Sequence, residues 1–232
     1  LFFMKNTWGK ALLCGFIVSV ACSFVNFSGK CDNISNKVFR LHIIANSNSE
    51  EDQSLKLKVR DRILKDFSGE SSEAKNMHEA EILAKDNIER LRISAQDEVY
   101  RNGYNYPVSA EIVNMHFNTR FYENVTLPAG NYDAFRITIG EAQGKNWWCV
   151  MFPPMCVPAA ESEKCIDDVL TETEADIVTN FGKYSIEFKT FEIFSEVNNF
   201  LICNFYNPIR EYFSSSDNFK YEMSFSFENL FD

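Results

Sequence analysis

Alternating apolar and polar positions predict several β-strands. Residues 38–45 alternate with the period of two that is typical of a half-buried strand. Residues 108–117 alternate as well, but their apolar positions change parity near Ile112 and Val113, which predicts a β-bulge at that point. Each of these stretches is short enough to be a single strand of a sheet.

The second half of the chain continues this pattern. Residues 134–139 and 147–152 alternate, and the glycine-containing segment 140–146 between them predicts a hairpin. Residues 184–188 are a further strand candidate, followed by a short helix at residues 191–203. The chain therefore groups several strands after its midpoint.

A period of three to four residues predicts two amphipathic helices between the first strand and the later ones. The first begins after the Ser/Asn run at residues 46–49, ends at Ser68-Gly69, and places acidic residues early and basic residues late, as the helix macrodipole favours. Its buried stripe is expected to be Leu55, Val59, Ile63 and Phe67. The second runs from about Ser72 to Arg101, with a seam of Met77, Ala84, Ile88, Leu91, Ala95 and Val99.

This order of elements predicts the fold class. One strand, two helices and then at least three strands are typical of an α+β layer. We expect a largely antiparallel sheet of about four to five strands, with the two long amphipathic helices packed on one face. The domain is predicted to span residues 37–203, and the Phe-rich tail at residues 204–232 gives no clear pattern.

The N-terminal segment, residues 1–30, has the pattern of an export signal. Lys5 and Lys10 precede an uncharged, apolar stretch from Ala11 to Gly29. The stretch is as long as the shortest membrane-spanning helices, so it predicts either a cleaved signal peptide or a retained membrane anchor. Cys22 ends a weak lipoprotein-like box and leaves lipidation as a third alternative.

The charge of the chain argues against two classes of partner. Apart from three lysines the first thirty residues carry no charge, so the remaining residues contain 20 basic and 33 acidic side chains, a net charge of −13. Nucleic acid and anionic membrane surfaces are repelled by such a chain. We expect no contact with nucleic acid, and a membrane contact only through the N-terminal segment.

Five of the seven cysteines follow the N-terminal segment, and an exported protein can oxidise them. Cys149 and Cys156 are the best candidate pair, because Pro153-Pro154 between them can turn the chain back. Two buried thiols are the alternative. The spacing does not fit a zinc knuckle, which needs two to four intervening residues.

Known catalytic patterns are missing from the sequence. The three histidines, His42, His78 and His116, stand in no metal-binding spacing, and no P-loop, dinucleotide fingerprint or nucleophile elbow is present. A thiol pair between Cys149 and His42 or His116 would make a secreted thiol-dependent hydrolase, which stays open as an alternative. We expect no catalytic residue, no metal, no cofactor and no small-molecule substrate.

Several segments in order resemble the stage II sporulation protein R family. The resemblance covers roughly residues 38–157 and lies in Phe39–Ser47, Asp52-Gln53, Leu57–Asp61, Leu127–Tyr132, Gly144–Val150 and Phe152–Cys156. It does not extend to the Phe-rich tail, nor to Cys165 and Cys203. Taken together, these segments are specific for the family.

The resemblance implies a signalling role in endospore formation. Members of this family are exported across the forespore membrane into the intermembrane space, where they activate a membrane-embedded aspartic protease of the mother cell. That protease processes a sigma-factor precursor. The chain would then be a secreted or N-terminally anchored messenger and not an enzyme, with an extracytoplasmic binding lipoprotein as a further alternative.

A messenger needs a rigid surface for its partner, and aromatic and arginine side chains dominate such surfaces. The candidates for partner contact, or for the scaffold that holds it, are His42, Asn46, Arg120, Arg136, Asn146, Trp147, Trp148 and Phe152, together with the Cys149 and Cys156 pair. By strand alternation we expect one of the two tryptophans in the core and the other on display.

Overall fold

A computed structural model describes residues 2–71, 74–122, 125–154 and 169–201, together with residues 204 and 206. The chain divides into two compact units, residues 1–192 and 193–232. The first unit contains every strand among the described residues. In the second, residues 193–201 are helical.

Four strands form the central sheet of the first unit, in the order β2-β5-β1-β6. They are β1 (Phe39–Ile44), β2 (Val108–Phe117), β5 (Gly130–Ile139) and β6 (Asn146–Phe152). β1 is parallel to β5, whereas β2 with β5 and β1 with β6 are antiparallel. The expected α+β class with a largely antiparallel sheet is confirmed. A separate hairpin of β3 (Arg120–Tyr122) and β4 (Val125–Leu127) was not predicted.

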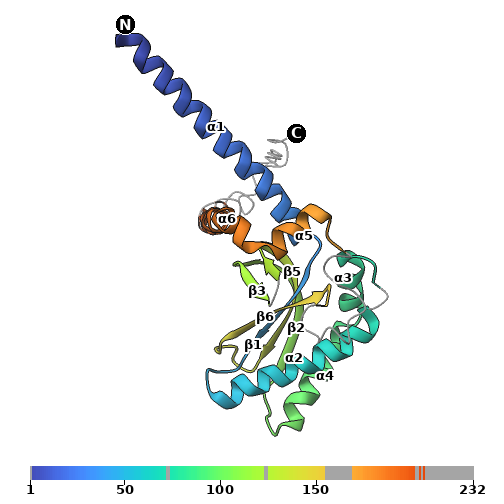
Figure 1. Cartoon of the computed structure of the whole chain (residues 1–232). Helices are drawn as coiled ribbons and strands as arrows, with labels where there is room; N and C mark the ends of the chain where they lie inside the picture. Colours follow the sequence, from blue (N-terminus) through green and yellow to red (C-terminus); the bar gives the residue numbers. More distant parts are fainter. Residues whose placement is uncertain are drawn as a thin grey trace, which may run out of the picture. The chain divides into compact units, whose positions relative to one another are not determined.

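One face of the sheet is covered by helices α2 (Glu50–Ser71), α3 (Met77–Asp86) and α4 (Ile88–Arg101), as Figure 1 shows. The predicted stripe of α2 is buried, with Leu55, Val59, Ile63 and Phe67 at most 2% exposed. From the sheet, Phe39, Leu41 and Ile43 enter the same core. Burial of these apolar side chains fixes α2 against the sheet.

The second predicted helix is in fact two helices. Asn87 has φ −104° and ψ 10°, outside the helical range, and separates α3 from α4. Asn76 caps α3 by accepting a hydrogen bond from the Glu79 backbone N–H at 2.9 Å. The seam is still continuous across the break, because Ala84, Leu91, Ala95 and Val99 are all fully buried.

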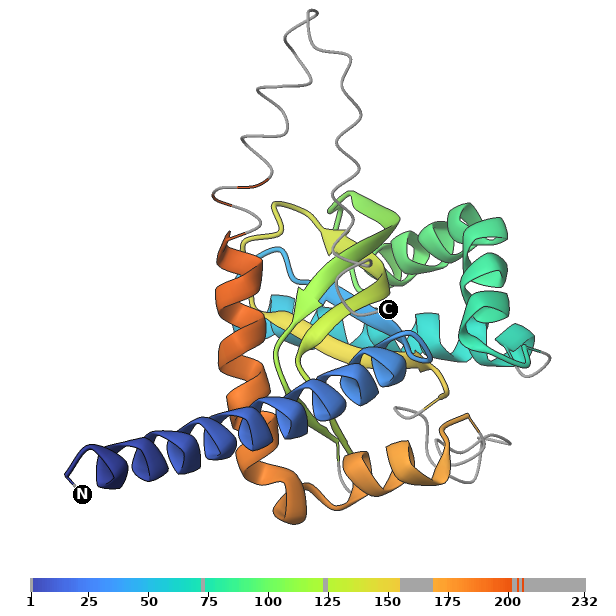
Figure 2. The ribbon, with the colours of Figure 1, turned by 90° about the horizontal axis from the view of Figure 1, so that it is seen from above.

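The opposite face of the sheet is covered at one end only. The last turns of α1 (Phe2–Ser35) lie there beside β5 and α5 (Glu172–Thr179), as Figures 1 and 2 show. The start of α6 (Phe181–Leu201) and the β3-β4 hairpin complete a second core. Within the described part of the chain, no helix has the length and hydropathy that a membrane crossing requires.

Three expectations about the strands were wrong. β1 is buried on both faces as far as Ile43, because on the side that was expected to be exposed the Phe117 ring covers Arg40 and the Trp148 ring covers His42. β5 and β6 do not form a hairpin, because β1 lies between them. β2 has no bulge: its register with β5 is unbroken from Val108 to Phe117, and the change of parity arises because Ala110 and Ile112 face one core while Met115 and Phe117 face the other.

Residues 184–188 are helical, so the strand predicted there is wrong. They belong to α6, whose only non-helical residue inside the described helix is Tyr184, with φ −111° and ψ 16°. Phe181, Tyr184, Phe188 and Phe191 follow a helical spacing, and Phe27 of α1 contacts the last three, with ring centroids 5.4 to 6.2 Å away. Phe188 and Phe191 are buried because they pack against α1, and the spacing of three to four residues between the aromatic residues of α6 is that of one face of a helix.

Candidate functional site

Four side chains form a row across all four strands, on the face opposite α2. Glu111 pairs with Arg136, Arg136 lies beside His42, and His42 pairs with Trp148. Side chains in such register stand next to each other on one face of a sheet. The row thus unites residues from β2, β5, β1 and β6.

A second row runs beside the first, at the end of the sheet that the second core leaves uncovered. It consists of Ser109, Thr138, Ile44 and Asn146. The Ser109 and Thr138 hydroxyls are hydrogen-bonded to each other. We call the eight residues of the two rows the open sheet face; all except His42 are half-buried or exposed.

His42 is the most buried member, with 3% of its surface exposed. Its ring stacks on that of Trp148, with centroids 4.0 Å apart and planes 5° from parallel. Its Nε2 lies 3.0 Å from Asn146 Oδ1, and because an amide oxygen only accepts, Nε2 donates this bond. The histidine is therefore held in one orientation and one tautomer, and its buried ring packs against the inner side of the Trp148 ring.

Burial lowers the pKa of His42 below its ordinary value of 6.5, and the charge of Arg136 acts in the same direction. The hydrogen bond to Asn146 opposes these two effects without cancelling them. His42 is consequently neutral at pH 7, with its single ring proton on Nε2. Its Nδ1 is buried and has no hydrogen-bond partner among the described residues.

One arginine lies within the open sheet face and a second lies at its border. Arg136 donates from Nε and Nη2 to Glu111 Oε1, at 2.9 and 2.7 Å. With side chains 31% and 49% exposed, this ion pair orients its partners more than it stabilises the fold. Arg120 of β3 lies at the boundary with the second core, its Cζ 5.4 Å from the centroid of the Trp148 ring.

Phe117 of β2 marks the boundary between the open sheet face and the second core. The Phe117 ring meets Trp148 edge-on, with centroids 4.9 Å apart. It also covers Arg40, whose Cζ is 4.2 Å from the Phe117 centroid and whose side chain is fully buried. Arg40 Nη2 donates to the Tyr122 hydroxyl at 2.7 Å and Nε donates to the Cys149 carbonyl at 3.3 Å. Arg40 therefore belongs to the core beneath the site.

Asn46 lies outside the open sheet face and has a scaffold position. Its Nδ2 donates to Asp52 at 2.8 Å, and its Oδ1 accepts from the Glu141 backbone N–H at 3.0 Å. Burial raises the pKa of Asp52, but hydrogen bonds from Ser47, Asn46 and Tyr106 outweigh it and hold the pKa below its ordinary value. This network ties the start of α2 to the loop that leads into β6.

The remaining predicted residues do not join the open sheet face. Trp147 points to the α2 side, where Arg60 Cζ lies 4.5 Å from its ring centroid, and Phe152 is fully buried there. The two tryptophans do face opposite sides, but both are half-buried, so neither is fully core or fully displayed.

Cys149 is fully buried and takes part in a disulfide. Cys156 lies outside the described residues, so the pairing of the two stays a prediction. A sulfur in a disulfide is not a thiolate, and the thiol-hydrolase alternative therefore gains no support. Among the described cysteines, Cys14 and Cys31 are free thiols, and burial raises the pKa of Cys31.

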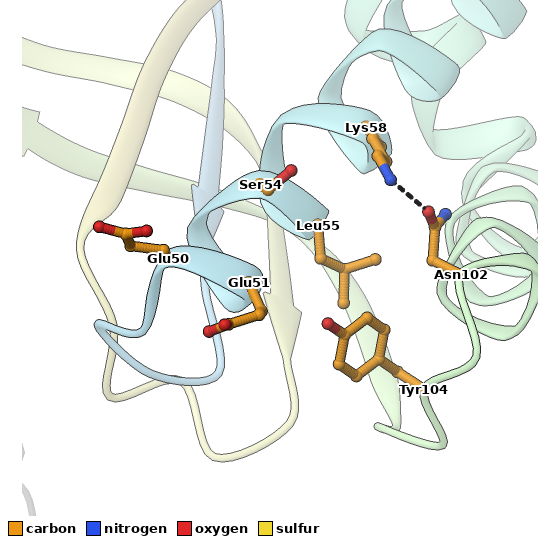
Figure 3. Close-up of a pocket in the computed structure, with 7 residues that line it drawn as sticks. All are labelled: Glu50, Glu51, Ser54, Leu55, Lys58, Asn102 and Tyr104. Atoms are coloured by element: carbon orange, nitrogen blue, oxygen red, sulfur yellow. Dashed lines mark hydrogen bonds between the residues drawn. The ribbon is translucent and has the colours of Figure 1, made fainter.

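A shallow pocket lies on the helical side, between the first turns of α2 and the end of α4 (Figure 3). It is lined by Glu50, Glu51, Ser54, Leu55, Lys58, Asn102 and Tyr104. Lys58 Nζ already donates to Asn102 Oδ1 at 2.6 Å, and the two glutamates occupy the first turn of a helix, where the macrodipole favours them. No buried, unpaired polar group points to a ligand there within the described residues.

Sequence reasoning missed Glu111, Ser109, Thr138 and Ile44. The alternation along β1, β2 and β5 does show on which face of its own strand each of these residues lies. It does not show which strands are neighbours, and without the strand order these residues could not be grouped with His42, Arg136 and Trp148. Among the residues that the structure describes, no group of His, Cys, Asp or Glu could hold a metal ion.

Comparison with known proteins gives the relationships of the chain. The model of the family described as stage II sporulation protein R matches residues 35–162, more than half of the chain. Stage II sporulation protein R of Bacillus subtilis (strain 168) is 35% identical over 123 residues, which are 53% of this chain and 55% of that protein. The chain thus aligns with about half the length of this relative, and no solved structure matches. The match includes β1, α2 and the whole open sheet face, and the chain belongs to the stage II sporulation protein R family.

Proposed function

We propose that this chain is an exported signalling protein of endospore formation. It crosses the forespore membrane by its N-terminal segment and activates a membrane-embedded aspartic protease of the mother cell, which then processes a sigma-factor precursor. The chain acts by binding and not by catalysis. Membership of the stage II sporulation protein R family supports this role.

The observation that carries the proposal is the row of Glu111, Arg136, His42 and Trp148. It lies on four hydrogen-bonded strands with a helical layer behind them, so its side chains are held in place before a partner arrives. A preorganised surface binds without a large entropic cost. Such a surface suits a messenger that must favour the active state of a protease over the idle one.

The test is co-expression in vegetative cells. This chain, the membrane protease and the sigma-factor precursor are produced together, and cleavage of the precursor is followed by immunoblot. We expect cleavage with the chain and little without it. Equal cleavage in both cultures would refute the proposal.

A pair of matched variants places the activity on the open sheet face. Trp148→Ala removes the ring that His42 supports, and we expect at least a tenfold loss of cleavage, as for an aromatic hot spot. Tyr100→Ala is the control, because this aromatic residue of α4 is 54% exposed on the other side of the sheet. Thermal unfolding of both purified variants shows whether a loss of cleavage is a loss of fold.

A further inference from the structure

We infer that the protease binds the Trp148 end of the open sheet face with an acidic segment, whose carboxylate pairs with Arg120 while a neighbouring apolar side chain packs on the Trp148 ring. This inference rests on the proposed function and names the chemistry of the partner. It commits to a protein carboxylate and not to a lipid headgroup.

Arg120 is the first reason. Its guanidinium has no ion pair and no hydrogen bond within the described residues, and its Nε is buried. The contact with Trp148, at 5.4 Å from Cζ to the ring centroid, holds the side chain in place but leaves its donors unused. Arginine matches a carboxylate through two parallel N–H donors, so an acidic partner satisfies it best.

Two further polar atoms are buried and have no hydrogen-bond partner among the described residues. They are Thr119 Oγ1, from the residue before Arg120, and His42 Nδ1, in the ring stacked on Trp148. Buried polar groups in folded proteins nearly always have a partner. Of these atoms, Arg120 Nε and Thr119 Oγ1 can donate to a carboxylate, and they belong to consecutive residues, so together they indicate that an acidic molecule completes the surface.

The balance of charge gives the sign of that molecule. The chain after its first thirty residues has a net charge of −13, but the open sheet face together with the adjoining Arg120 carries two arginines and one glutamate. Glu111 already neutralises Arg136, so the uncompensated charge lies at Arg120. The aromatic plane of Trp148 beside this charge suits a segment in which Asp or Glu adjoins an aliphatic or aromatic residue.

The experiment uses the co-expression assay and the binding of the purified chain to the detergent-solubilised protease. Arg120→Glu should lower both cleavage and affinity at least tenfold, and Arg120→Lys should lower them less, since it keeps the charge but loses the two parallel donors. Arg101→Glu is the matched control, because Arg101 is an exposed arginine on α4. Binding of the wild-type chain should weaken as sodium chloride is raised, and binding of Arg120→Gln should respond less.

The outcomes separate the two proposals. If the wild-type chain triggers no cleavage, the proposed function fails and the inference falls with it. If the wild type triggers cleavage and Arg120→Glu equals Arg101→Glu, the inference alone is wrong. Binding to phosphatidylglycerol vesicles that Arg120→Glu abolishes, with protease binding intact, would also overturn it. If Arg120→Glu does not fold, Arg120→Gln replaces it in both assays. Thermal unfolding shows whether each variant is folded.

Discussion

At the scale of single residues, His42 owes its burial and its tautomer to contacts with Trp148 and Asn146 of β6. Periodicity along β1 placed His42 on a polar strand face, whereas the structure buries it beneath a tryptophan and fixes its proton on Nε2. Neither property can be deduced from β1 alone, because both depend on β6. The residue types were visible in the sequence, but their contacts were not.

The buried, neutral His42 predicts a pH dependence of stability. Its pKa is lowered in the folded state, so the unfolded chain binds the proton more readily, and stability is lost as pH falls through the ordinary value of 6.5. Urea unfolding from pH 8 to pH 5 measures this loss. His42→Gln should reduce the slope, and His78→Gln should not, since the His78 side chain is 77% exposed. Equal slopes in all three proteins would contradict the prediction.

Two elements, the start of α2 and the loop before β6, are locked to each other. Gln143 N–H donates to the Asn46 carbonyl at 3.1 Å, and Gly144 N–H donates to the Ala45 carbonyl at 2.9 Å. Lys56 of α2, only 3% exposed, donates from Nζ to the Lys145 carbonyl at 2.8 Å. The loop therefore sets the position from which β6 enters the sheet beside β1.

Gly144 is a point of close backbone approach in this contact. A Cβ on Gly144 would lie 2.2 Å from the Ser47 carbonyl oxygen, a backbone atom that cannot rotate away. Gly144→Ala should therefore lower the free energy of unfolding by about 1–3 kcal/mol, measured in urea. Gly29→Ala, in α1 and with nothing within 4 Å of its added Cβ, should have no such effect. An unchanged midpoint for Gly144→Ala would show that the loop can move aside.

At the scale of the first unit, one face of the sheet is covered by helices and the other is covered at one end by the second core. The helical side was expected from the two amphipathic stripes. The second core was not, because it takes Phe27, Cys31 and Ile34 from the predicted export segment and its flank. Apolar composition is common to an export signal and to a core helix, so the contacts of α1 with α5, α6 and β5 could not be predicted from it.

Phe27 tests whether the end of α1 belongs to the folded unit. It is 6% exposed and touches three aromatic rings, so Phe27→Ala should lower the free energy of unfolding by about 3 kcal/mol. Val25→Ala, two residues earlier on the same helix and 52% exposed, is the control and should change it by less than about 0.5 kcal/mol. Circular dichroism of the purified chain in increasing urea gives both values. Equal stabilities would show that the last turns of α1 do not contribute.

Local pattern alone was sufficient to locate α2 and β1 and to recognise the family, although it wrongly assigned a strand to residues 184–188. The period of α2, the alternation of β1 and the motifs from Phe39 to Cys156 need only neighbouring residues, because helix and strand faces are set by spacing along the chain. Tertiary structure decided the order β2-β5-β1-β6, and with it the row of Glu111, Arg136, His42 and Trp148. These residues are far apart in sequence, and non-local strand pairing depends on which surfaces can be buried together, not on any local pattern.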